Sequence, residues 1–131
     1  MGRQLAIYGA TLIAVAILDA IWLGVIARSW YQAGIGHLMA PSPNIPAAAA
    51  FYLLYPIGLV IFAITPAGGE WTRAAMMGAL FGLFAYGTYD VTNLAILKDW
   101  PLGLSIVDTV WGAFVGGVAA AVGTVVAQKF N

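Results

Sequence analysis

The chain alternates between four long apolar segments and short polar connections. A helix needs about 20 mostly apolar residues to cross the hydrocarbon core of a bilayer. Each segment reaches that length, and we expect helices over about 4–28, 45–65, 70–97 and 102–129. Helices joined by short connections run antiparallel. The pattern therefore predicts an all-α integral membrane protein, a four-transmembrane-helix antiparallel bundle forming a single transmembrane domain over residues 1–131.

The longest connection, residues 29–43, is polar and contains glycine. Its aromatic and aliphatic residues, Tyr31 among them, predict a short amphipathic segment between the first two helices, lying at the membrane interface. The second helix is expected to begin with Asn44 as its N-cap and Pro46 in its first turn. Pro56 is expected to kink this helix.

Composition supports a membrane environment and excludes several kinds of site. The 131 residues are 63% hydrophobic and only 8% charged, against about 25% charged residues in soluble domains. The net charge is zero and the basic residues are scattered, so nucleic-acid binding is not expected. The chain has no cysteine and one histidine, and we predict neither a metal site nor a cofactor.

The distribution of basic residues predicts an orientation. Arg3, Arg73 and Lys129 fall on the side of the two termini, whereas Arg28 and Lys98 fall on the side of the long first connection. The positive-inside rule then places both termini of this multi-pass protein in the cytoplasm.

Three aspartates lie inside the predicted spans. A charged side chain in the hydrocarbon costs about 2.5–3.5 kcal/mol on insertion scales, so each needs a structural or functional reason. From the rise of a helix, Asp19, Asp90 and Asp108 lie roughly 14, 10 and 9 Å from the side of the long connection. Tyr52 lies about 10 Å deep on the same scale. We therefore expect one polar layer in that half of the bilayer.

Helical spacing adds neighbours to this layer. Residues three or four apart share a helix face, which groups aromatic and amide side chains with the aspartates, and helices one and four both contain Asp-x-x-Trp. The candidate ligand- or proton-binding residues are Asp19, Trp22, Tyr52, Tyr86, Tyr89, Asp90, Asn93, Asp108 and Trp111.

The polar layer has a structural and a functional interpretation. Hydrogen bonds between aspartates and neighbouring donors would hold the helices in register, although such bonds contribute only about 0.6 kcal/mol on average. Three acids without a lysine or arginine among them repel one another, so at least one is expected to be protonated. A shared proton or a bound cation would relieve the repulsion that remains.

Several segments together resemble the bacterial membrane family named domain of unknown function 2177. They are Asp19-Ala-Ile-Trp-Leu, Phe51-Tyr-Leu-Leu-Tyr55, Tyr86-Gly-Thr-Tyr-Asp-Val-Thr-Asn-Leu94, Trp100-Pro101 and Asp108-Thr-Val-Trp-Gly112. The resemblance covers nearly the whole chain and implies a bacterial inner-membrane protein. It carries no catalytic assignment.

Three functions stay open from the sequence. The first is binding or transport of a proton, a cation or a small amphipathic ligand at the carboxylate layer. The second is a membrane enzyme of lipid modification or stress response, with an aspartate as general acid or base, although no catalytic motif supports it. The third is an accessory or assembly subunit whose glycine-bearing faces pack on a partner. The expected partners are the lipid bilayer, a small amphipathic ligand, and either a second copy or another membrane protein.

Overall fold

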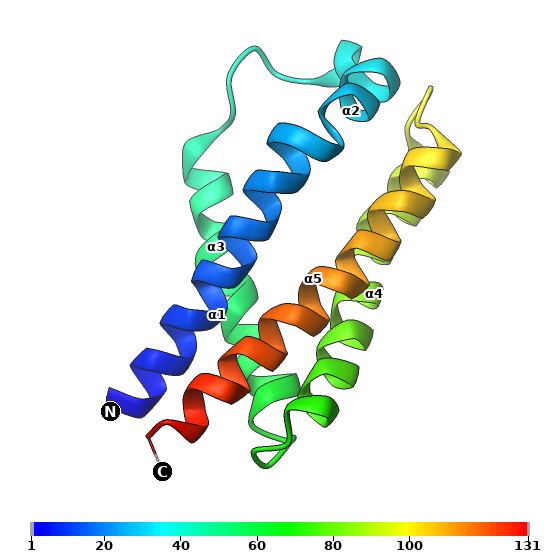
Figure 1. Cartoon of the computed structure of the whole chain (residues 1–131). Coiled ribbons are helices and arrows are strands. Elements are labelled where there is room, and N and C mark those ends of the chain that lie inside the picture. The colour runs from blue at the N-terminus through cyan, green and yellow to red at the C-terminus, as the bar shows by residue number, and fades with distance from the viewer. Residues whose placement is uncertain (1, 131) are drawn as a thin grey trace.

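The computed structural model describes residues 2–130, and the part it describes is helical, without strands. The long helices lie side by side, with both termini at the same end (Figure 1). The elements in chain order are α1 (Gly2–Ile21), the π-helical turn η1 (Trp22–Ile26), α2 (Arg28–Ile35), the 3-10 turn η2 (Gly36–Leu38), α3 (Ile45–Leu59), the π-helical turn η3 (Val60–Ile64), α4 (Trp71–Ile96) and α5 (Leu102–Gln128).

Three helical segments are long and apolar enough to cross a membrane: Gly2–Ile26, Ile45–Ile64 and Leu102–Gln128. The predicted all-α class is confirmed, and three of the four predicted helices are candidate membrane spans. Helix α4 has the length for a span, but its threonines, its asparagine, Arg73 and Asp90 lower its mean hydropathy. The fourth span stays a prediction.

The ends of the first two long helices differ in detail from expectation. The first helix was expected to end at Arg28, but it passes into the π-helical turn after Ile21, and Arg28 begins the separate helix α2. The expected amphipathic segment is thus a helix of two turns. The predicted N-cap of α3 is confirmed, because the Asn44 side chain accepts a hydrogen bond from the Ala47 N–H at 3.1 Å. Pro56 stays within α3, four residues before the second π-helical turn.

Helices α4 and α5 form the most extensive contact between helices in the described chain. Glycines allow this approach. A Cβ added to Gly82 would overlap the carbonyl oxygen of Gly112 and lie 2.7 Å from its carbonyl carbon, and one added to Gly78 would overlap the carbonyl oxygen of Gly116. Close backbone packing replaces the hydrophobic effect as the cause of helix association in lipid. These glycines therefore fix how α4 and α5 face each other.

Aromatic side chains hold α3 and α4 apart. The ring of Tyr55 lies 5.5 Å from that of Phe81 and 6.0 Å from that of Tyr86. The backbone of α4 instead approaches η3, the continuation of α3, whereas the backbones of α3 and α4 stay apart and meet only through side chains. The bundle is consequently tight at the end with the termini and open between α3 and α4 at the end with α2.

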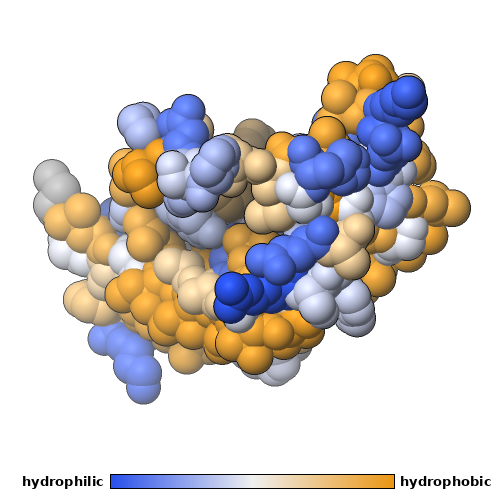
Figure 2. Space-filling model, turned by 90° about the horizontal axis from the view of Figure 1, so that it is seen from above, coloured by the Kyte–Doolittle hydropathy of each residue, from blue (hydrophilic) through white to orange (hydrophobic). Residues whose placement is uncertain are grey.

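The end that carries α2 is capped by polar residues. Viewed from above, hydrophilic side chains gather on this end, and hydrophobic residues extend along the flanks (Figure 2). Helix α2 and the segment that follows it cross from α1 to α3 over this end (Figure 1). This arrangement suits the expected position of α2 at a membrane–water interface.

Candidate functional site

A cavity of about 550 Å³ lies within the α2 half of the bundle, where α3 and α4 are separated. Its walls are mostly apolar, and all the long helices contribute to them. The lining residues are Asp19, Trp22, Leu23, Tyr31, Ala48, Phe51, Tyr52, Ala85, Tyr86, Tyr89 and Asp108. Two carboxyl groups therefore stand in an otherwise apolar and aromatic cavity.

Asp19 joins three helices through its carboxylate. The Tyr52 hydroxyl of α3 donates to Oδ2 at 3.0 Å, and the Trp111 Nε1–H of α5 donates to Oδ1 at 3.2 Å. The residue is only 6% exposed. Each carboxylate oxygen thus has one donor from a different helix, which fixes the orientation of the group and leaves lone pairs for a ligand.

Asp108 is held by a donor from α2. The Tyr31 hydroxyl of α2 donates to its Oδ1, and the Trp22 Nε1–H lies 3.4 Å from the Tyr31 hydroxyl oxygen. Trp22 and Trp111 stack with ring centroids 4.5 Å apart and planes at 6°. The two Asp-x-x-Trp segments, one spanning α1 and η1 and the other in α5, therefore meet through their stacked tryptophans.

Asp90 lies behind Asp108 instead of on the cavity wall. It is 1% exposed, and its Oδ2 accepts a hydrogen bond from the Thr109 hydroxyl at 3.2 Å. Its carboxyl also interacts with that of Asp108. Two neighbouring carboxylates repel each other, and a proton on one of them relieves the repulsion. Asp90 and Asp108 are thus placed to share a proton.

The remaining predicted site residues divide between the cavity and its surroundings. Trp22, Tyr52, Tyr86 and Tyr89 line it with Asp19 and Asp108, whereas Trp111, Asp90 and Asn93 do not. Trp111 acts on the cavity through Asp19, and Asn93 is half-buried next to Tyr89. Whether any of these residues binds a ligand stays a prediction.

Tyr31 is a cavity residue that the sequence did not single out. We expected it at the interface, but its hydroxyl turns inward to Asp108. Burial, and then the hydrogen bond and negative charge of Asp108, raise the pKa of Tyr31 above its ordinary value. The phenol therefore stays protonated as a donor. Its place in an amphipathic segment was the only sequence signal for an inward-facing tyrosine.

Tyr55 is a buried polar group close to this network. It is 8% exposed, and its hydroxyl has no hydrogen-bond partner among the described residues. A buried hydroxyl without a partner costs about 1–3 kcal/mol. Tyr55 packs against Phe51 and Tyr86, two of the lining residues.

No basic side chain balances the buried acids within residues 2–130. The ion pairs found there lie at the two ends, between His37 and Asp99 at 4.0 Å and between Arg73 and Glu70 at 3.7 Å. Arg28 is exposed. In the same described range no group of three or more metal-ligating side chains could hold a metal ion. The cavity thus has uncompensated acidic groups.

Comparison with known proteins identifies the family. The model of a family of predicted membrane proteins, DUF2177, matches residues 4–125. The chain belongs to this family, as its motifs suggested, and is a membrane protein of unknown function. No curated protein and no solved structure matches it.

Proposed function

We propose that the protein binds a small amphipathic molecule with a cationic head group in the cavity between α1, α3, α4 and α5. The observation that carries this proposal is that Asp19 and Asp108 both line one mostly apolar cavity, with no basic residue beside them in the described chain. Ligand sites in proteins typically combine apolar walls, a few convergent polar groups and a volume of about 300–1,000 Å³. The cavity meets all three conditions.

The chemistry of the wall favours a cation. The hydroxyl and indole donors satisfy part of the acceptor capacity of the carboxylates, but they supply no positive charge. An ammonium group would supply it and would donate hydrogen bonds to the free lone pairs. The aromatic rings of Trp22, Tyr52 and Tyr86 would contact the apolar part of the ligand and attract the cation where a ring face is presented.

Binding of dodecylamine to protein in lipid nanodiscs tests the proposal. Radiolabelled dodecylamine is measured by scintillation proximity against empty nanodiscs, with dodecanol as the neutral competitor of equal chain length. We expect dodecylamine to compete and dodecanol to compete weakly. Loss of one member of a buried charge pair costs about 2–5 kcal/mol, so Asp19→Asn should weaken binding by about 30-fold or more.

Asp99→Asn is the matched control, because Asp99 is an exposed aspartate at the same end of the molecule. It should bind dodecylamine as the wild type does. Equal binding by the wild type and by Asp19→Asn, or equal competition by dodecanol, would contradict a cation-binding cavity.

The Asp90–Asp108 pair supports proton binding as a second candidate function. Two facing carboxyl groups hold one proton more readily than two negative charges. Carbon-detected NMR of the aspartate side chains in wild type and in Asp90→Asn would test it. The proposal predicts the signal of one protonated carboxyl group in the wild type that is lost in this variant, and absence of this signal from the wild type would exclude a shared proton.

We also infer that α4 is a fourth span and that both termini lie in the cytoplasm of a bacterium, with the protein in the inner membrane. The 26 residues of α4 correspond to about 39 Å of helix, longer than the roughly 30 Å hydrocarbon core. Its Asp90 is buried, while exposed residues such as Leu80, Phe84 and Val91 offer an apolar surface to lipid. A green fluorescent protein fused to the C-terminus should fluoresce, and alkaline phosphatase at the same position should be inactive. The opposite result would reverse the orientation.

A further inference from the structure

We infer that the ligand is a single-chain amphiphile of the bilayer, and that it reaches the cavity sideways between α3 and α4. This inference rests on the proposed cation-binding function and adds a class of ligand and a route. The head group would lie at Asp19 and Asp108, and the hydrocarbon chain would extend outward between the two helices into lipid.

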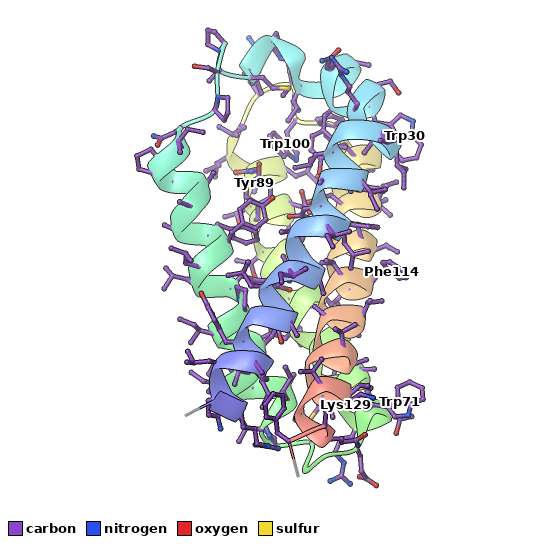
Figure 3. The ribbon with its side chains drawn as sticks, turned by 60° about the vertical axis from the view of Figure 1, so that its left-hand side comes forward. Trp30, Trp71, Tyr89, Trp100, Phe114 and Lys129 are labelled. Atoms are coloured by element: carbon purple, nitrogen blue, oxygen red, sulfur yellow. The ribbon has the colours of Figure 1, made fainter. Side chains whose placement is uncertain are left out.

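Residues of α3 and α4 that line the cavity form the two sides of the gap between these helices. Helix α3 contributes Ala48 and Phe51, helix α4 contributes Ala85 and Tyr89, and the backbones of the two helices stay apart. Phe51 is 38% exposed and Tyr89 is 54% exposed. Figure 3 shows Tyr89 in the space between the α3 and α4 ribbons. The cavity therefore opens where the apolar flank of the molecule would face lipid.

The route from water is obstructed by α2. The Tyr31 hydroxyl of this helix is bonded to Asp108, directly over the acidic wall. On the same side Trp30 packs edge-on against Trp22, with ring centroids 6.1 Å apart. A water-soluble cation would have to displace this helix, whereas a molecule already dissolved in the bilayer would not.

The character of the gap limits the shape of the ligand. Ala48 and Ala85 leave room between the helices, and Phe51 and Tyr89 present apolar ring surface to a chain passing between them. A cavity of about 550 Å³ has the size of a site for a drug-sized molecule. It suits one head group and the first part of one chain better than a lipid with two chains. Positive charge on the head group would complement the two acids that line the cavity.

Photoaffinity labelling tests the route. Dodecylamine with a diazirine in the middle of its chain is bound to the wild-type protein in nanodiscs. The sample is irradiated, and mass spectrometry then locates the labelled residues. Specific labelling is the part removed by excess unlabelled dodecylamine. We expect it on the facing surfaces of α3 and α4, centred on Ala48, Phe51, Ala85 and Tyr89.

A matched pair of variants tests whether a bulky side chain in the gap between α3 and α4 blocks binding. Ala48 lines the cavity and the adjacent Ala49 does not. A phenylalanine at the lining position overfills the gap, so Ala48→Phe should lower specific labelling by about tenfold, whereas Ala49→Phe should leave it unchanged.

The outcomes separate this inference from the proposed function. Specific labelling that is lost in Asp19→Asn but falls on α2 and residues 36–44 would overturn the sideways route and leave cation binding intact. Absence of specific labelling at every position would overturn both. Equal labelling in the two alanine variants would also contradict a route between α3 and α4.

Discussion

Replacing Gly82 by alanine should destabilise the bundle through the contact between α4 and α5. The new Cβ would overlap the Gly112 carbonyl oxygen, lie 2.7 Å from the carbonyl carbon and approach the Tyr55 hydroxyl at 3.2 Å. The obstructing atoms of Gly112 are backbone, so relief requires the helices to separate. Overfilling of a packed core costs about 1–3 kcal/mol, which corresponds to about a 5- to 150-fold change in the unfolding equilibrium.

Gly87→Ala is the control on the same helix. A Cβ at Gly87 would meet only the Thr109 methyl group, at 3.4 Å. Both substitutions gain the same helix propensity of about 1 kcal/mol, so the difference between the variants isolates the steric cost. Unfolding of both proteins in mixed micelles, followed by tryptophan fluorescence as the fraction of dodecyl sulfate rises, measures that difference. Equal midpoints would refute the close backbone contact.

The remaining predictions concern the polar network and use single side-chain changes. Trp111→Phe removes a donor to Asp19 and should destabilise the protein by about 0.6–1.7 kcal/mol in the same unfolding assay, whereas Phe114→Leu, at an exposed position, should have a smaller effect. Because the pKa of Tyr31 is raised, its phenol should remain protonated at pH 10, where an ordinary tyrosine is about half ionised. The phenolate absorbance of wild type and Tyr31→Phe should therefore be equal at this pH, and an excess in the wild type would contradict the buried hydrogen bond. Tyr31→Phe should also leave Asp108 without its tyrosine donor. We expect this variant to weaken dodecylamine binding less than Asp19→Asn does. A larger loss of binding than in Asp19→Asn would assign Tyr31 a direct contact with the ligand.

The level of the acidic residues could be predicted because it depends on helix geometry alone. The rise per residue and the ends of the apolar segments place Asp19 and Asp108 at similar depth, and in the structure both line the same cavity. The N-cap at Asn44 could likewise be predicted, because capping is a local interaction.

Helix geometry does not predict the direction in which each of these side chains faces. Asp90 shares the depth of Asp108 but turns toward Thr109 instead of the cavity. Its rotation depends on which glycines of α4 and α5 meet, and that register is set by tertiary packing. The sequence shows small residues on these helices without showing which ones are in contact.

The inward orientation of the Tyr31 side chain of α2 could not be predicted from the sequence either. An amphipathic segment next to a membrane is expected to rest on lipid, and Tyr31 fits that expectation as well as it fits its observed contact. The π-helical turns at Trp22–Ile26 and Val60–Ile64 have no local signal either. The aromatic separation of α3 from α4, which creates the cavity, involves Tyr55, Phe81 and Tyr86 from distant parts of the chain.

Contact between an ammonium head group and the acidic wall is the most direct test of the account. Nuclear Overhauser effects can be measured between the methylene protons next to the nitrogen of dodecylamine and the aromatic protons of the protein in nanodiscs. The account predicts contacts with the rings of Trp22, Tyr52 and Tyr86, all lost when Asp19 and Asp108 are both replaced by asparagine. Contacts confined to tryptophans at the ends of the molecule, such as Trp30 and Trp71, or contacts that persist in the double variant, would contradict it.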